Sequence, residues 1–301
     1  MKETRTNRLE NPIIFIGTGR SGSTFISGAV LSHIKLGYPS NYQNRFPKNL
    51  SINLIKNLYD NKLWRIYTRG NKNSIYHRSL FLPSEAYDMW KHITNENTDF
   101  SRDFLYQKKA SGEEIKRVRL FFDKMLILQN KDRLAFKITG PGRIGFLLSI
   151  FPDAQFVWVK RRIIPTVSSF MKRRFWEKRG KSNLWFKGVY SNKDKEYVNG
   201  LINHPAELTA FQLGKIISTI EKEIQNLNPA ILAVEYEDFL NSPDEKIDEI
   251  LDFLDLEKDK ACYNYVKYNK VSSRQKKDND YYTEQEIDFI MKAFHTGLGN
   301  V

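Results

Sequence analysis

The chain has 301 residues, 41% of them hydrophobic, and its 20 Phe, 15 Tyr and 5 Trp are enough for a packed core and argue against a disordered chain. Its longest apolar runs, such as 13–16 and 146–151, are far shorter than the roughly 20 residues that span a bilayer. The first residues lack the apolar segment of a secretory signal. With one cysteine, Cys262, the chain has no intrachain disulfide and no cysteine-based metal site. We therefore expect a cytoplasmic protein whose contact with membranes is at most peripheral.

The formal net charge is +13, from 48 Lys and Arg against 35 Asp and Glu. Such a field attracts nucleic acid, an anionic membrane surface or a polyanionic small molecule. The densest basic segments are 160–162 and 172–181, where a solvated helix face is an equally good interpretation. No zinc-finger spacing, RNA-binding aromatic motif or basic heptad region accompanies the charge, so nucleic acid is not the expected partner.

The predicted elements alternate between strands and helices along the chain. Short apolar runs predict buried strands at 13–17, 133–138, 155–160 and 230–236. Helical spacing predicts helices at 25–36, 113–130, 142–150, 164–177 and 206–227, and a further helix that Ser242 and Pro243 open. This alternation predicts an α/β fold with a mostly parallel sheet covered on both faces.

The chain shows no internal repeat and no low-complexity linker, which predicts one domain over residues 1–301. Residues 38–83 are polar and rich in turn-forming residues. Long irregular segments in compact domains are often functional, and mobile surface is the alternative. We therefore expect a polar lid or insertion at about residues 38–110, beside the site.

A glycine-rich turn follows the first predicted strand, in the sequence IIFIGTGRSGSTF over residues 13–25. A strand, a tight turn and a helix start aim backbone N–H groups at an anion. Glycines in the turn permit positive φ angles and close approach of the backbone to a ligand. The segment therefore predicts an anion-binding site.

The turn fits the dinucleotide-binding pattern G-x-G-x-x-G through Gly17, Gly19 and Gly22. That site needs an acidic residue about 20 positions later to hold the ribose. No Asp or Glu stands between Glu10 and Asp60, so this interpretation loses most of its support.

The same turn nearly fits the nucleoside triphosphate loop, G-x-x-x-x-G-K-[ST], but Ser23 stands at the lysine position. The cation of this turn is Arg20, two residues before Gly22. A guanidinium there can form two hydrogen bonds to a phosphate or sulfate and offset charge on a leaving group. Arg20 is therefore a candidate for both binding and catalysis.

The segment TGRSGSTF resembles the 5′-phosphosulfate loop of the sulfotransferases that use 3′-phosphoadenosine 5′-phosphosulfate (PAPS), of the soluble bacterial type. The resemblance implies a P-loop-like three-layer α/β fold, with a central, mostly parallel sheet flanked by helices. It also implies sulfuryl transfer from PAPS to an acceptor hydroxyl, release of 3′-phosphoadenosine 5′-phosphate (PAP), and no metal. The residues it assigns to the donor are Arg20, Ser21, Gly22, Ser23, Thr24 and Phe25.

A second resemblance lies in QFVWVKRRIIPTVSSF, residues 155–170. The family's 3′-phosphate site has an Arg at a strand end and a Ser eight residues later, and Arg161 and Ser169 stand in that relation. The family usually has Asp or Asn followed by Pro or Ala where this chain has Arg162 and Ile163. The choice between Arg161 and Arg162 therefore stays open at this stage.

The segment VEYEDFL, residues 234–240, resembles the family's Tyr-Glu-Asp-Leu segment and implies that Tyr236 lies near the adenine. Glu237 and Asp238 are better explained as capping and scaffold groups than as catalysts. In the family an adenine-side loop lies near the tail, where Ser273 and Arg274 are the candidates.

The base that accepts the hydroxyl proton is the least defined part of the predicted site. Several family members place a His two residues after the Lys of the segment that FKITGPG, residues 136–142, resembles, but here Lys137 is followed by Ile138 and Thr139. Other members use a Glu from the chain after the first helix, which makes Glu85 the candidate base. The alternative is that Glu85 is an ordinary acidic residue in the first turn of a helix.

Two histidines are further candidates for the base, and His77 is preferred to His92. Two other functions stay open: a P-loop kinase or NTPase with a displaced cation, and an inactive anion-binding or nucleic-acid-binding protein of the same fold. The acceptor would be a small molecule, a carbohydrate or a lipid alcohol. Trp176, Trp185 and Phe186 beside basic residues suit a sugar or an amphiphilic alcohol, although core packing explains them equally well.

Overall fold

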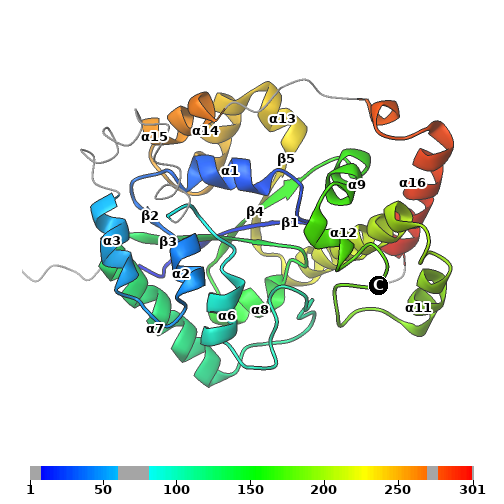
Figure 1. Cartoon of the computed structure of the whole chain (residues 1–301). Helices are drawn as coiled ribbons and strands as arrows, with labels where there is room; N and C mark the ends of the chain where they lie inside the picture. Colours follow the sequence, from blue (N-terminus) through cyan, green and yellow to red (C-terminus); the bar gives the residue numbers. More distant parts are fainter. Residues whose placement is uncertain (1–7, 60–80, 270–276, 300–301) are drawn as a thin grey trace, which may run out of the picture.

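The computed structural model describes residues 8–59, 81–269 and 277–299 (Figure 1). Within these residues five strands form one sheet in the order β2-β3-β1-β4-β5, and each neighbouring pair is parallel. The strands are β1 (Ile13–Gly17), β2 (Leu36–Gly37), β3 (Arg133–Thr139), β4 (Gln155–Lys160) and β5 (Ala230–Glu235). Because the strands are parallel, their carboxyl ends lie along one edge of the sheet, the edge at which ligands bind in open α/β sheets.

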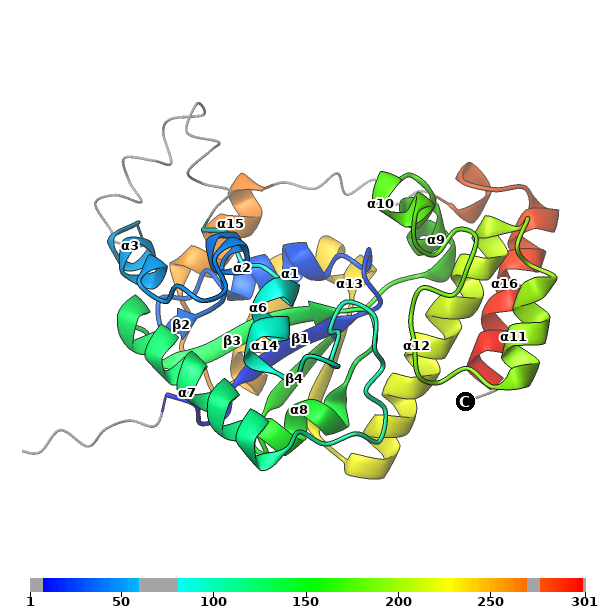
Figure 2. The same cartoon turned by 60° about the horizontal axis from the view of Figure 1, so that its bottom comes forward.

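Helices cover both faces of the sheet and make it the middle of three layers (Figures 1 and 2). One face carries α1 (Ser23–Val30), α13 (Tyr236–Asn241), α14 (Pro243–Phe253) and α15 (Lys260–Tyr268). The other carries α6 (Tyr87–Ile93), α7 (Gly112–Gln129), α8 (Ile144–Ile150) and α12 (Pro205–Leu227), with α16 (Glu284–Gly299) packed along α12. The remaining helices are α2 (Asn41–Arg45), α3 (Ile52–Tyr59), α9 (Ile163–Met171), α10 (Arg174–Glu177), α11 (Asn192–Asn199) and the 3₁₀ turn η1 (Asp278–Asp280).

The alternation of side chains along β1 divides the hydrophobic core into two parts. Ile13 and Phe15 pack on the side of α1 and α14, whereas Ile14 and Ile16 pack on the side of α7 and α12. All four side chains have no exposed surface. A strand buried on both faces has no polar alternation, which explains why a continuous apolar run predicted it. The predicted three-layer fold with a parallel sheet is confirmed.

Two predicted helices differ from those observed. The helix predicted over 25–36 ends at Val30, and its last predicted residue, Leu36, begins β2, a two-residue strand beside β3. The helix predicted over 164–177 is two helices, because α9 ends at Met171 and α10 begins at Arg174. The break turns the chain so that Trp176 is buried against Phe170, with ring centroids 4.6 Å apart.

The described part of residues 38–110 contributes to the core as well as to the surface. Trp90, Phe100 and Phe104 have at most 1% of their surface exposed, and Trp90 stacks on Phe100 at 4.4 Å between ring centroids. These aromatic rings fix α6 and the segment after it against α7 and α8. No helix in the described part of the chain is both long and apolar enough to cross a membrane.

Candidate functional site

The glycine-rich turn lies at the carboxyl end of β1 and leads into α1. Gly19, Arg20 and Gly22 have φ angles of 81°, 56° and 87°, in the left-handed region. A Cβ on Gly22 would lie 2.1 Å from the ring of Tyr236. A larger residue would therefore clash with this ring, and it would also have to adopt a left-handed backbone conformation. The tight turn predicted from the glycines is therefore present, and it brings the loop onto Tyr236.

The loop leaves polar groups available to a ligand. Gly22 is the N-cap of α1 and provides no side-chain cap for the first N–H groups of this helix. The hydroxyl of Ser21 is buried and has no hydrogen-bond partner among the described residues. Buried polar atoms are almost always satisfied, so a missing partner at a helix N-terminus indicates a place for a bound group.

Arg20 lies in a concentration of positive charge. Its Nε donates a hydrogen bond to Ser169 Oγ at 3.0 Å, and Arg161 Nη1 donates to the carbonyl oxygen of Arg20 at 2.9 Å. Burial lowers the pKa of Arg20, and the charges of Arg173 and Arg161 lower it further, while Glu85 opposes them. Clustered guanidinium groups repel one another, and a bound anion would relieve that repulsion.

The side chains of Arg161 and Arg162 lie in different surroundings. The Arg161 guanidinium lies 4.7 Å from the ring centroid of Tyr236, and its buried Nε has no hydrogen-bond partner in the described part of the chain. Its nearest carboxylate, on Glu237, is 4.0 Å away. Arg162 is more exposed and forms ion pairs with Glu237 at 3.7 Å and Asp278 at 3.1 Å. Arg161 therefore faces the loop, with Ser169 and Tyr236 nearby, whereas Arg162 is paired at the surface.

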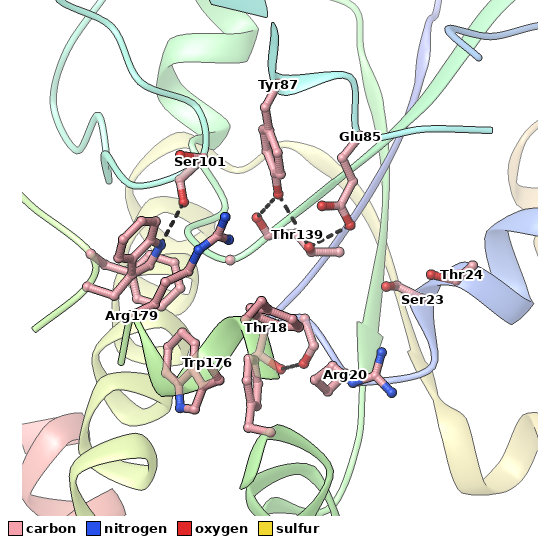
Figure 3. Close-up of a pocket in the computed structure, with 16 residues that line it drawn as sticks. Thr18, Arg20, Ser23, Thr24, Glu85, Tyr87, Ser101, Thr139, Trp176 and Arg179 are labelled. Atoms are coloured by element: carbon pink, nitrogen blue, oxygen red, sulfur yellow. Dashed lines mark hydrogen bonds between the residues drawn. The ribbon is translucent and has the colours of Figure 1, made fainter. Parts of the chain in front are cut away.

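A cavity of about 370 Å³ opens beside the loop at the same edge of the sheet (Figure 3). Thr18, Arg20, Ser23 and Thr24 line one side, and Trp176, Arg179 and Ser101 line the other. Glu85, Tyr87 and Thr139 lie between them. The other lining residues are Gly19, Gly140, Phe170, Phe175, Trp185 and Phe186.

Glu85 is held in this cavity by two groups from β3. Thr139 donates its hydroxyl to Glu85 Oε1 at 2.7 Å, and Lys137 Nζ lies 3.4 Å from the same oxygen. Lys137 also donates to Thr24 Oγ1 at 2.9 Å, which connects the carboxylate to the start of α1. The alternative that Glu85 is a helix first-turn acid is wrong, because α6 begins at Tyr87 after Ala86, whose φ is 51°.

Tyr87 completes this wall of the cavity, and no motif in the sequence indicated it. Its hydroxyl donates to the carbonyl oxygen of Thr139 at 3.2 Å. Burial raises the pKa of Tyr87, and the charge of Glu85 raises it further, so the hydroxyl keeps its proton at neutral pH. Arg143 is fully buried, and burial lowers its pKa to about 10. Only a three-dimensional fold could bring these residues to Glu85, since no motif links them.

Several predicted site residues lie elsewhere. Phe25 packs its ring against Phe239 and Tyr265, at 5.8 and 6.1 Å between centroids, and does not line the cavity. His92 is exposed on α6 and is likewise absent from the lining. The candidates His77, Ser273 and Arg274 lie outside the described residues, as does Asp60. In residues 8–59, 81–269 and 277–299, no group of three or more His, Cys, Asp or Glu side chains is placed to hold a metal.

These features define an α/β protein with a parallel sheet, a glycine-rich loop at its carboxyl edge and a carboxylate in the adjoining cavity. The family model described as "Sulfotransferase family" matches residues 12–260. The chain belongs to this family, whose members are transferases.

Solved structures of bacterial sulfotransferases share the fold. Sulfotransferase STF9 from Mycobacterium avium superposes with a TM-score of 0.59 at 13% identity, over 96% of this chain and 77% of that chain. Sulfotransferase STF1 from Mycobacterium tuberculosis H37Rv gives 0.53 at 13% identity, over 95% of this chain and 76% of that chain. A comparison with curated protein sequences gives no match. At such low identity the superpositions show the fold alone.

Proposed function

We propose that this protein transfers the sulfuryl group of PAPS to an acceptor hydroxyl and releases PAP. One observation carries the proposal: the loop of Arg20 and the carboxylate of Glu85 line the same cavity. A donor anion on the loop and a hydroxyl beside Glu85 would therefore meet without a rearrangement of the sheet. The family supports sulfotransfer, and the geometry supports this assignment of the two substrates.

In this proposal the donor lies along the carboxyl edge of the sheet. The 5′-phosphosulfate would bind the N–H groups at the start of α1, the hydroxyls of Ser23 and Thr24, and the Arg20 guanidinium. The buried hydroxyl of Ser21 would gain a partner. The 3′-phosphate would bind Arg161 and Ser169, and the adenine would lie near Tyr236, whose ring already contacts Arg161.

The reaction follows from the two sides of the cavity. The acceptor oxygen attacks sulfur in line with the bridging oxygen of PAPS, the S–O bond to the 5′-phosphate breaks, and PAP leaves with the electron pair. Glu85 accepts the proton of the attacking hydroxyl. Thr139 and Lys137 bind the carboxylate, so it is fixed in place before the acceptor arrives.

Cationic groups would stabilise the negative charge that develops on the leaving phosphate. Arg20 lies in the loop, and Lys137 reaches Thr24 and Glu85 at once. Preorganised donors of this kind stabilise the transition state without reorganisation during the reaction. The mechanism requires no metal ion.

The acceptor would enter between Glu85 and the aromatic side chains of Phe175, Trp185 and Phe186. This lining suits a small molecule, a carbohydrate or a lipid alcohol that presents a hydroxyl to Glu85. We propose that residues 1–301 form one cytoplasmic domain and that the stretch 38–110 borders this entrance, since Glu85, Tyr87 and Ser101 come from it.

Titration calorimetry with PAP, ADP and ATP, each with and without Mg²⁺, tests the donor assignment. We expect PAP to bind without metal and more tightly than ADP, and labelled PAPS to transfer its label to a hydroxyl compound. Binding of Mg-ATP in preference to PAP would instead support a kinase or NTPase. Binding of DNA or RNA with a steep salt dependence, and none of PAP, would support a nucleic-acid-binding protein.

A further inference from the structure

The far side of the cavity contains a cation that the transfer reaction does not use. Arg179 lines the cavity opposite the loop, and it is half-buried. Its guanidinium lies 5.4 Å from the ring centroid of Phe175 and 4.6 Å from that of Trp185. Among the described residues it makes no ion pair and no side-chain hydrogen bond. Two aromatic rings thus hold a guanidinium whose hydrogen-bond donors are available to a ligand.

The guanidinium of Arg102 lies on the same ring as that of Arg179 but already makes a hydrogen bond. Arg102 lies over Trp185 at 4.2 Å, but its Nε donates to the carbonyl oxygen of Trp185 at 2.9 Å. Arg102 does not line the cavity, whereas Arg179 does. Guanidinium groups on Trp185 also compete with a sugar for stacking on that ring. This arrangement favours recognition by charge over recognition by stacking.

The charges of the cavity point to an anionic ligand on this side. The charged residues that line it are Arg20, Arg179 and Glu85. Glu85 is paired with Lys137, and the donor phosphosulfate would neutralise Arg20, so no charge in the described lining of this first cavity is left to balance Arg179. Arg179 lies across the cavity from Arg20 (Figure 3), which separates it from the donor loop.

A second cavity continues from this point. It has a volume of about 440 Å³ and shares Tyr87, Ser101 and Arg179 with the first. The other charged residues in its lining are Lys91, Asp88, Glu96 and Asp99, so this second cavity itself is not basic. Arg179 therefore lies where the two cavities meet, and any acceptor too long for the first cavity would pass it. An acidic group of the acceptor that lies a short distance from the reacting hydroxyl would reach this guanidinium from the first cavity, where Glu85 is the only carboxylate among the described lining residues.

From this geometry we infer that Arg179 is a specificity-determining residue that selects acceptors carrying an acidic group, a carboxylate or an ester sulfate or phosphate, in addition to the hydroxyl. The inference rests on the proposed function and narrows its acceptor class. Arg179 forms charge-assisted hydrogen bonds to the acid while the hydroxyl lies at Glu85. It takes no part in the transfer step itself.

Matched acceptors test this inference: 4-hydroxyphenylacetate against its neutral amide, and methyl glucuronide against methyl glucoside. Each pair is measured with labelled PAPS for kcat/KM, and by calorimetry for binding to the PAP-loaded protein. We expect the acid to be preferred by about tenfold or more, as one charge-assisted contact implies. Arg179→Gln should abolish the preference, and Arg179→Lys should retain part of it. Lys178→Gln is the matched control, because Lys178 is exposed and lines neither cavity, and it should keep the full preference.

The affinity for PAP separates this inference from the proposed function. Absence of PAP binding would contradict the proposed function itself. With PAP bound, the inference is overturned if the neutral compounds are preferred, if Arg179→Gln keeps the preference, or if none of the four compounds binds or reacts. A large loss of PAP affinity in Arg179→Gln would also overturn it, because Arg179 would then belong to the donor site.

Discussion

Thr139 donates its hydroxyl to Glu85 Oε1 over 2.7 Å, although the two residues are 54 positions apart in the chain. Thr139 is the last residue of β3, at the carboxyl edge of the sheet, and Glu85 lies just before α6. The contact brings a carboxylate from a loop onto a rigid strand, two residues from Lys137. Under the proposed function, Glu85 takes the proton of the acceptor hydroxyl and Thr139 holds Glu85 in place.

Replacement of Glu85 by Gln keeps the shape of the side chain and removes its basicity. We expect kcat to fall on the order of 10²–10⁴-fold, the usual contribution of a general base, with the affinity for PAP near that of the wild type. Turnover with labelled PAPS and calorimetry with PAP provide the two measurements. His77→Ala is the companion variant: if it is inactive while Glu85→Gln stays within a few-fold of wild type, the base is His77. If both variants remain active, neither residue is the base.

Thr139→Val removes one hydroxyl and nearly preserves volume. A hydrogen bond to a charged group contributes about 1.5–3 kcal/mol, so we expect kcat to fall roughly 10–100-fold if the bond holds Glu85 in its reactive position. Thr139→Ser restores the hydroxyl and should recover most of the activity. PAP affinity should be unchanged in both variants. Equal activity of Val and Ser at this position would mean that Lys137 alone fixes the carboxylate.

Arg161 and Arg162 provide a matched pair for the 3′-phosphate. Arg161→Ala should weaken PAP binding about 10–100-fold, as the loss of a charge-assisted contact implies, and should weaken adenosine 5′-phosphosulfate binding less, because that ligand lacks the 3′-phosphate. Arg162 is paired with Glu237 and Asp278, so Arg162→Ala should leave both affinities within a few-fold of wild type. Both ligands are measured by calorimetry. If Arg161→Ala weakened the binding of both ligands equally, Arg161 would instead support the loop through its hydrogen bond to the carbonyl oxygen of Arg20.

The sequence predicted the main strands and the tight glycine-rich turn because these features are local. Buried parallel strands are continuous apolar runs, and the turn at Gly19–Gly22 needs residues that tolerate positive φ angles. The two-residue strand β2 was missed because it follows directly from a helical pattern and has too few residues for a strand signal.

The environment of Glu85 could not be predicted in the same way. Its position after the first helix indicates Glu85, but its partners, Thr139 and Lys137, come from β3. In the sequence this segment is notable only because no His stands two residues after Lys137. Tyr87 and Arg179 carry no motif, and the fold alone brings them into the cavity. Long-range contacts of this kind depend on how helices pack on the sheet, which spacing along the chain does not encode.

Gly22→Ala tests whether the shape of the loop is needed for both stability and donor binding. At a φ of 87° an Ala side chain costs about 1–2 kcal/mol, and here its Cβ would also lie 2.1 Å from the Tyr236 ring. We expect Tm to fall by at least about 2 °C, and PAP affinity to fall because the loop or the ring must move. Differential scanning calorimetry and PAP titration measure the two effects.

Gly112→Ala is the matched control for this prediction. Gly112 begins α7, and its backbone lies outside the left-handed region. Apart from its chain neighbours and its own helix backbone, no described atom lies within 4 Å of a Cβ built there, so Ala should leave Tm unchanged or raise it slightly. PAP affinity should not change, because Gly112 is absent from the cavity lining. If Gly22→Ala matched the control in both Tm and PAP affinity, the loop would be too adaptable for the rigid anion site that the proposed function requires.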